Sequence, residues 1–363
     1  MVRLLHCSLK FSYTQYMLTL NQATSETRVI LKWGAVILFL LLLILVLFRV
    51  GGILKDKFFP QAPPPPTVSF GKLPLIVFPN VSNKNFNYSL NTVTGALPTF
   101  PDRIKIYKMA AIPPDLLALK KAVERVNSVG FTNPELPISA KVYQWNDNGP
   151  LNRSLTMDIF SSDFSLSSSF ISDPVIMSGV NLPDPNTAAI TAQSFLSGMS
   201  SFPDDIDSAK TKSLLFSINN NTLISATSVS NAQVIEIDFF QKDIDKFPIY
   251  YPKAVSSTMN VLVAGGKDQG QVVQADFSHQ TISNESATYP IKTAGDAYSL
   301  LKQGQGYIAS YFGSSTDISI KDVFLAYYIG EKKQDYLFPI AVFEGDNGFF
   351  AYVPVVTDGW TSN

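Results

Sequence analysis

Residues 33–48 read WGAVILFLLLLILVLF, an apolar stretch of sixteen residues without a charged side chain. Continuing through Arg49 to Leu54 gives twenty-two residues, enough to cross a bilayer as a helix, because an arginine near a helix end can extend its guanidinium group to the interface. On the membrane-insertion scale Val36–Phe48 contributes roughly −5 kcal/mol, against at most about +3 kcal/mol for the arginine. The sequence therefore predicts a transmembrane helix over 33–54.

Two other structures can produce an apolar stretch of this length. A buried core helix carries polar residues on at least one face, whereas Val36–Phe48 has none. A cleavable signal peptide has a short charged region and a small-x-small cleavage site, but here the preceding region is long and Pro60-Gln61-Ala62-Pro63 follows. We therefore interpret the segment as an uncleaved signal anchor. The residues expected to contact the lipid bilayer include Trp33, Val36, Leu40, Leu43, Phe48 and Arg49.

The charges around this helix favour a cytoplasmic N-terminus. The short tail, 1–32, contains four basic residues and one acidic residue, and an excess of basic residues is typical of the cytoplasmic side. Three further basic residues, Arg49, Lys55 and Lys57, flank the other end of the helix, so the flanking charges alone do not decide the orientation. We expect a single-pass protein of the cell membrane with a cytoplasmic tail and extracytoplasmic C-terminal domains.

A proline-rich stalk over residues 55–67 is predicted to follow the helix. Pro63 to Pro66 cannot form a helix or a central strand and favour the polyproline II conformation. About eight such residues at roughly 3.1 Å each give a spacer of about 25 Å. A ligand for an SH3-type domain would need a basic residue beside its proline core and a cytoplasmic location, so we prefer the interpretation as a spacer.

The composition argues against several functional classes. The 363 residues carry a formal net charge of −1, so the broad positive field that nucleic acids select is missing and we expect no nucleic-acid partner. Cys7 is the only cysteine, and His6 and His279 are the only histidines, which argues against a zinc site in the main domain. No cofactor-binding motif is identified. The hydrophobic content of 46% is enough for folded cores.

Beyond the stalk, a single helix followed by several strands recurs three times. Helices are predicted to begin near Pro113, near Pro185 and after Thr293, where Asp296 is placed to form a capping box. Isolated helices among many strands favour the α+β class over a parallel doubly wound sheet. We expect two antiparallel-sheet domains, 68–175 and 176–363, each with one or two packed helices and the second built from two helix-plus-strands units.

The alternation typical of a half-buried strand is clearest in residues 234–239. The side chains predicted to point inward are Ile235, Ile237 and Phe239, and those predicted to point outward are Glu236 and Asp238.

The last part of the chain resembles a known family. The resemblance is carried by Tyr289-Pro290-Ile291-Lys292-Thr293, the helix around Ala297, Phe324-Leu325-Ala326-Tyr327-Tyr328, Tyr336-Leu337-Phe338-Pro339 and Phe350-Ala351-Tyr352-Val353. About seventy-five C-terminal residues are similar to the YycH and YycI-type proteins, single-pass membrane regulators of a bacterial cell-wall sensor kinase, and more loosely to PepSY-like domains. The resemblance implies a regulatory or scaffolding role without catalysis, and it supplies no catalytic residue.

Few residues in the sequence are candidates for catalysis or metal binding. His279 follows Ser278 at the end of a predicted strand, and we interpret it as a turn histidine rather than a general base. Ser299 and Lys302 have the spacing of serine–lysine acyl enzymes, but the serine falls inside a predicted helix instead of at its start. The acids of 204–207 and 243–245 lack the glycine hinge and the glutamate of a calcium loop. We predict no catalytic residue, no metal site and no enzyme activity.

The predicted function is that of a membrane-anchored extracytoplasmic binding, regulatory or scaffolding protein of the bacterial cell envelope, with a membrane or envelope protein as its partner. Two alternatives stay open: a structural subunit of an envelope assembly, and a hydrolase that uses only Asp and Glu, which would need a carboxyl pair in a cleft. A partner surface is hypothesised at the C-terminus, where aromatic residues are dense. Its residues are Phe349, Phe350, Tyr352 and Trp360.

Overall fold

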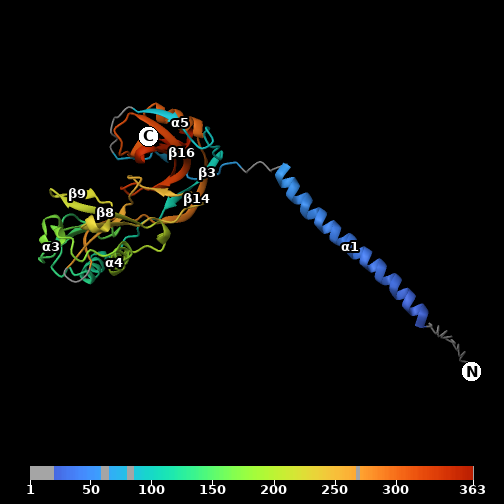
Figure 1. The fold of residues 1–363 in the computed structure, drawn as a ribbon, viewed down its shortest axis with the longest axis horizontal. Coiled ribbons are helices and arrows are strands. Elements are labelled where there is room, and N and C mark those ends of the chain that lie inside the picture. The colour runs from blue at the N-terminus through green and yellow to red at the C-terminus, as the bar shows by residue number, and fades with distance from the viewer. Residues whose placement is uncertain (1–19, 59–64, 80–85, 267–269, 363) are drawn as a thin grey trace, which may run out of the picture. The chain divides into compact units, whose positions relative to one another are not determined.

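The computed structural model describes residues 20–58, 65–79, 86–266 and 270–362. The chain divides into two compact units, Met1–Pro65 and Pro66–Asn363. The first unit contains the helix α1 (Leu20–Phe58), and the second contains the remaining helices and the strands (Figure 1).

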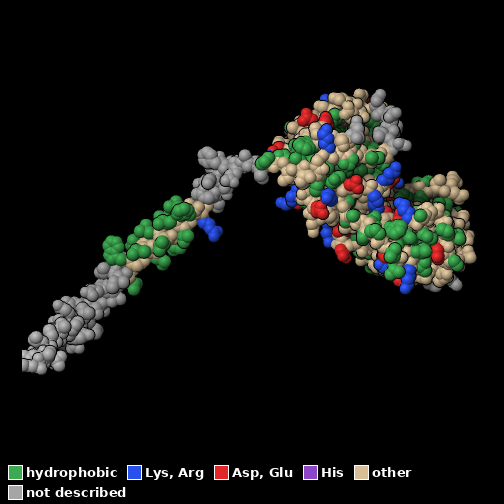
Figure 2. Space-filling model, turned by 180° about the vertical axis from the view of Figure 1, so that it is seen from behind, with side chains coloured by type: hydrophobic (Ala, Val, Ile, Leu, Met, Phe, Trp, Pro, Cys, Tyr) green, Lys and Arg blue, Asp and Glu red, His purple; other side chains and the backbone are tan. Residues whose placement is uncertain are grey.

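The helix α1 contains the predicted membrane span. Its window Leu31–Arg49 has a mean hydropathy of 2.8 and none of it is buried in the protein, and Figure 2 shows apolar side chains covering this surface. Within the described part of the chain it is the one helix long and apolar enough to cross a membrane. The helix continues to Phe58, so the predicted stalk does not begin at residue 55, because residues 55–58 are helical. Residues 59–64 of that stalk lie outside the described residues.

The second unit has the predicted α+β architecture, and its larger sheet is antiparallel throughout. This sheet has nine strands. In order across the sheet they are β4 (Leu136–Pro137), β5 (Val142–Asn146), β6 (Ser154–Asp158), β7 (Phe164–Ser167), β13 (Gln271–Phe277), β12 (Met259–Ala264), β10 (Val234–Asp238), β8 (Lys212–Asn219) and β9 (Thr222–Ser225).

A second sheet of eight strands is built mainly from the C-terminal part of the chain. Its central path is β11 (Ile249–Tyr250), β16 (Asp317–Tyr328), β17 (Tyr336–Gly345), β18 (Phe350–Pro354) and β15 (Tyr307–Ser310). The strands off this path are β2 (Asn87–Leu90), which pairs with β16, β3 (Arg103–Met109), which pairs with β17, and β14 (Ile282–Pro290), which pairs with β3. The short strands β1 (Leu73–Pro74) and β19 (Thr361–Ser362) form a separate parallel pair.

The sheets do not follow the predicted division at residue 175. Strand β7 pairs with β13, and β3 pairs with β14 and β17, so strands from both predicted domains contribute to each large sheet. Local alternation shows that a segment is a strand but not which distant strand completes its hydrogen bonds. The unit instead forms two lobes, one with the nine-stranded sheet and one with the eight-stranded sheet (Figure 1).

The structure confirms two of the predicted helices. The helix α4 (Pro185–Gly198) begins with the side chain of Asp184 accepting backbone hydrogen bonds, and α5 (Ala294–Lys302) begins with the Thr293–Asp296 capping box. The helix α2 (Ala118–Ser128) begins later than predicted. The short helices are α3 (Pro174–Met177), η1 (Phe170–Ser172), η2 (Ser208–Lys210), η3 (Val229–Asn231), η4 (Asp346–Gly348) and η5 (Asp358–Trp360).

One continuous core connects the two lobes. The helix α4 packs on β10, β12 and β13 through Ala188, Ala192 and Leu196, which are fully buried. The helix α5 packs on β18. Buried residues of both sheets, such as Ile237 and Phe343, belong to the same apolar cluster. Because both sheets contribute to this close-packed cluster, the two lobes are joined by a continuous core.

Candidate functional site

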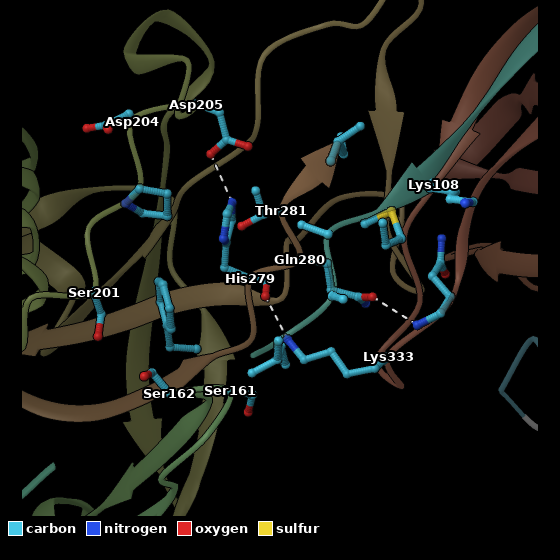
Figure 3. Close-up of a pocket in the computed structure, with 18 of the residues that line it drawn as sticks. Lys108, Ser161, Ser162, Ser201, Asp204, Asp205, His279, Gln280, Thr281 and Lys333 are labelled. Atoms are coloured by element: carbon cyan, nitrogen blue, oxygen red, sulfur yellow. Dashed lines mark hydrogen bonds and ion pairs between the residues drawn. The ribbon is translucent and has the colours of Figure 1, made fainter. Parts of the chain in front are cut away.

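A cleft of about 920 Å³ lies where the two lobes meet. One wall comes from the eight-stranded sheet, with Lys108 at the end of β3 and Tyr336 at the start of β17. The other wall comes from the loop after α4, residues 200–205, and from the β6–β7 loop with Ser161 and Ser162. Figure 3 shows Lys108, Ser161, Ser162 and Ser201 among the side chains around the cleft. The cleft is therefore shared by parts of the chain that lie far apart in sequence.

A link of four residues between β13 and β14 crosses the cleft and contains His279. The ring nitrogen Nε2 of His279 lies 2.9 Å from Oδ1 of Asp205. Because an ionised carboxylate can only accept, Nε2 carries the proton in this hydrogen bond. The other carboxylate oxygen, Oδ2, accepts a hydrogen bond of 2.8 Å from Nε2 of Gln241. Both oxygens of Asp205 are therefore fixed, and Oδ1 orients the imidazole ring.

The electrostatics of Asp205 follow from these contacts. Burial by itself raises its pKa, but the hydrogen bond and charge of His279, and then the hydrogen bond from Gln241, outweigh burial, so that the pKa lies below the usual carboxyl value. Asp205 therefore stays ionised. Behind it, Oε1 of Gln241 accepts a hydrogen bond of 3.3 Å from the hydroxyl of the buried Tyr251.

Gln280 and Lys333 connect the lobes on the same side of the cleft. Nε2 of the buried Gln280 donates to the carbonyl of Gly330 at 2.9 Å, and Oε1 accepts from the backbone N–H of Gln334 at 3.0 Å. Lys333 donates to the carbonyl of His279 at 2.7 Å and to Oδ1 of Asp163 at 3.0 Å. The β16–β17 loop of one lobe is thus attached to the link and to the β6–β7 loop of the other.

The cleft is suited to binding a ligand that has both polar and apolar parts. Serine hydroxyls, the Asp205–His279 pair and Lys108 offer donors and acceptors, while Phe202 and Tyr336 offer flat apolar surfaces. Such a set recognises hydroxyl and amide groups together with apolar faces. Among the described residues no serine hydroxyl is hydrogen-bonded to His279, so the neighbouring Ser278 does not form a serine–histidine pair with it.

The other residues singled out in the sequence have structural contacts. The hydroxyl of Ser299 donates to the carbonyl of Gly295 within α5, and the ammonium of Lys302 lies over the ring of Tyr298. Asp243 pairs with Lys210, and Asp245 pairs with Lys105. Within the described ranges no three His, Cys, Asp or Glu side chains converge on a position where a metal ion would fit.

The hypothesised aromatic partner surface is wrong for two of its four residues. Phe349 and Tyr352 are fully buried, whereas Phe350 and Trp360 are half-buried. The ring of Phe349 packs against Phe86 at a centroid distance of 5.8 Å. Tyr88 also packs on Phe349, and Tyr250 packs on Phe350 and Tyr352, so these aromatic side chains do not form a common exposed surface. The anchor residues Trp33, Val36, Leu40, Leu43, Phe48 and Arg49 all lie exposed on α1.

A second cavity of about 600 Å³ lies on the nine-stranded sheet, on the face opposite α4. Glu236, Asn260 and Asp276 line it. The prediction that Asp238 points outward to solvent is wrong, because this residue is 0% exposed and its Oδ1 accepts a hydrogen bond of 2.8 Å from the backbone N–H of Ser257. The sequence shows that Glu236 and Asp238 lie in an otherwise apolar strand. It does not show that the loop containing Ser257 packs against Asp238.

No protein-family model matches the chain, and no curated protein sequence matches it. Among solved structures, the chain is similar to an uncharacterized protein from Eubacterium rectale, with 13% identity and a TM-score of 0.37 over 78% of this chain and 91% of the other. It is also similar to the C-terminal domain of YpeB from Bacillus megaterium, with 12% identity and a TM-score of 0.32 over 70% of this chain and 97% of the other.

Proposed function

We propose that this chain is a membrane-anchored binding protein of the bacterial cell envelope, which regulates or scaffolds a partner through the cleft between its lobes. The observation that carries the proposal is a cleft of about 920 Å³ with mixed polar and apolar walls from both lobes. A molecule bound there contacts both lobes at once, and its affinity then depends on their spacing. The resemblance to YycH and YycI-type regulators points to the same kind of role and stays a prediction.

The proposed location rests on α1. Its exposed apolar window is stable in hydrocarbon and costly to expose to water. The excess of basic residues in the tail favours a cytoplasmic N-terminus, and with this orientation the unit from Pro66 to Asn363 is extracytoplasmic. The bilayer is thus the first proposed partner, and an envelope or membrane protein is the second.

The topology can be tested with the single cysteine of the chain. Cys7 lies in the N-terminal tail, and Lys120 is exposed on α2. In intact cells a membrane-impermeant maleimide should label the variant Cys7→Ser with Lys120→Cys, but not the natural chain until the membrane is permeabilised. Labelling of Cys7 in intact cells would reject the proposed orientation.

The role of the cleft can be tested by photo-crosslinking in cells. A photoreactive phenylalanine analogue at Ser201, which lines the cleft, should crosslink one envelope partner. The same analogue at Lys120, on a surface outside the cleft, is the matched control. If both positions give the same products, or if Ser201 gives only homo-oligomers, the partner-binding role is wrong, and homo-oligomers would favour the structural subunit.

The carboxylate-only hydrolase is a second candidate because the structure contains a carboxyl pair, Glu236 and Asp238. Glycosidases hold their two carboxyl groups about 5–9.5 Å apart across the substrate. Here the two residues lie two positions apart on β10, and Asp238 has no exposed surface with which to reach a substrate. This geometry favours binding over hydrolysis. Glycan cleavage by the anchored chain that disappears in Glu236→Gln would support the hydrolase instead.

A further inference from the structure

A second segment that connects the lobes lies along the cleft, residues 110–117 between β3 and α2. Its first part, residues 110–113, lines the cleft and is exposed. Strand β3 belongs to the eight-stranded sheet, whereas α2 is attached to the other lobe, because the hydroxyl of Ser128 donates to the carbonyl of Gly198 on α4 at 2.6 Å. Part of the cleft wall is therefore exposed chain that belongs to neither sheet.

The backbone of this segment is extended. Residues 110–115 continue from β3 without a turn. The sequence Ile112-Pro113-Pro114 favours this conformation, because proline fixes its own φ and keeps the residue before it out of the helical region. The segment thus has the backbone shape of a strand but lies beyond the end of the sheet.

The backbone groups of this extended segment have no partner of their own. The N–H of Ala110 donates to the carbonyl of Thr281 at 2.8 Å, and this is the last bond on that side of β3. The N–H groups of Ala111 and Ile112 and the carbonyls of residues 110–113 form no hydrogen bond within the described residues. In a strand the N–H and C=O of one residue point to the same side, so Ala111 presents a free donor and a free acceptor together.

Exposed apolar side chains continue the segment beyond the cleft. Ile112 and Leu117 are 46% and 56% exposed, and Leu116 is fully exposed. Neighbouring large apolar side chains that face solvent are typical of an interaction surface. In the cleft itself, Phe202 and Tyr336 add half-buried rings. The ligand that fits this surface has apolar side chains as well as backbone-like hydrogen-bonding groups.

The unpaired charge of the cleft is negative. Its lysines and its histidine already have acidic partners: Lys108 with Glu285, Lys333 with Asp163, and His279 with Asp205. Asp204 and Asp335 also line the cleft and are exposed, and their carboxylates contact no donor in the described part of the chain. A basic group on the ligand is complementary to these two carboxylates.

On the basis of the proposed role of the cleft, we propose that its occupant is an extended polypeptide segment of another protein. The segment pairs with the backbone of Ala111 as an added strand, places apolar side chains against Ile112 and carries a basic side chain. Pairing of main chains is a recurring way in which an exposed strand-like backbone binds an extended peptide. A glycan offers hydroxyl groups but neither the alternating N–H and C=O groups nor the aliphatic side chains that this surface matches.

The first test uses the photoreactive phenylalanine analogue at Ser201 in cells. Ala111→Pro removes the free N–H while keeping an extended backbone, and it should lower the yield of the partner crosslink at least about fivefold, because a hydrogen bond is lost and its acceptor is left unpaired. Thr99→Pro is the matched control, at an exposed residue outside the cleft whose N–H is also free in the described structure. It should crosslink as the natural chain does.

The second test changes the ligand and does not depend on the folding of a variant. The crosslinked segment of the partner, identified by mass spectrometry, is synthesised as a peptide and titrated onto the full-length chain in detergent micelles. N-methylation of one alternate set of its amides should weaken binding at least about tenfold, and of the other set less than about threefold, because only one set faces Ala111. Asp204→Asn combined with Asp335→Asn should weaken binding about fivefold.

The outcomes separate this inference from the proposed function. If Ser201 crosslinks an envelope protein, but Ala111→Pro and both sets of N-methyl groups leave binding unchanged, the added strand is wrong and the partner-binding role stands. A product degraded by glycosidases but not by proteases would identify a glycan and overturn the inference, as would crosslinking to copies of this chain alone. If Ser201 gives no product, the proposed function and this inference fail together.

Discussion

The ammonium nitrogen of Lys333 lies 3.0 Å from Oδ1 of Asp163 and 2.7 Å from the carbonyl oxygen of His279. Lys333 belongs to the β16–β17 loop of one lobe and Asp163 to the β6–β7 loop of the other. The side chains are 37% and 26% exposed, so solvent screens the pair. The contact is therefore suited to holding the lobes at one spacing without locking them.

Lys333→Gln should loosen the contact between the lobes while changing the free energy of unfolding by less than about 1 kcal/mol, as exposed ion pairs contribute little. Hydrogen–deuterium exchange should become faster in residues 278–282 and 330–334, which the lysine connects. Lys332→Gln is the matched control, because its side chain forms no contact of this kind in the described structure. Equal exchange in both variants would show that the ion pair does not restrain the lobes.

Phe349→Ala should destabilise the folded unit strongly. Phe349 is fully buried, and replacing a buried phenylalanine by alanine typically costs about 3–5 kcal/mol. Phe312→Ala, at a residue 72% exposed, should change the free energy of unfolding by less than about 0.5 kcal/mol. Urea unfolding monitored by circular dichroism gives both values. A Phe349 variant as stable as the natural chain would restore this residue as a candidate for the partner surface.

Asp205→Asn should destabilise the protein at neutral pH but not in acid. The pKa of Asp205 is lower in the folded protein than its ordinary value of 3.8, so its stabilising contribution is present above that value and is lost as the pH falls through the folded-state pKa. The unfolding midpoints of the variant and the natural chain should therefore converge at acid pH. Asp204→Asn, next to it but with no hydrogen bond to its carboxylate in the described structure, should show no such convergence.

Leu40→Arg combined with Leu43→Arg should release the chain from membranes. Each change makes insertion less favourable by about 3–4 kcal/mol, so the two together exceed the roughly −5 kcal/mol available from the apolar stretch. Sodium carbonate extraction followed by immunoblotting should move the variant to the supernatant. Arg49→Leu, which only lengthens the apolar stretch, should stay in the pellet. Release of the natural chain by carbonate would refute the anchor itself.

Part of the candidate site was visible in the sequence as single residues. His279 was identifiable because histidine is scarce, and Asp205 lay in an acidic run. Their pairing was not visible, because the two residues are 74 positions apart in the sequence and five strands of the nine-stranded sheet, β8, β9, β10, β12 and β13, lie between them. The contact between Lys333 and Asp163 could not be predicted either, because the two residues are 170 positions apart and no local sequence pattern links them.

The sequence by itself determined the features that depend on neighbours along the chain. The apolar stretch defined α1, the Thr293–Asp296 capping box defined the start of α5, and the Asp346-Asn347-Gly348 turn defined the final hairpin, where Asn347 and Gly348 adopt positive φ of 55° and 66°. Each of these depends on helix periodicity, capping or turn geometry, which act over a few residues.

Only the tertiary structure decided which strands pair, where the cleft forms and which acidic residue is buried. Strand β3 finds its partners β14 and β17 near the other end of the chain, and the loop containing Ser257 turns the predicted outward Asp238 into a buried carboxyl. Strand register and loop packing are set by the free energy of the whole core, to which distant segments contribute together. The alternation of apolar and polar residues within one strand does not indicate which distant segments pack against that strand.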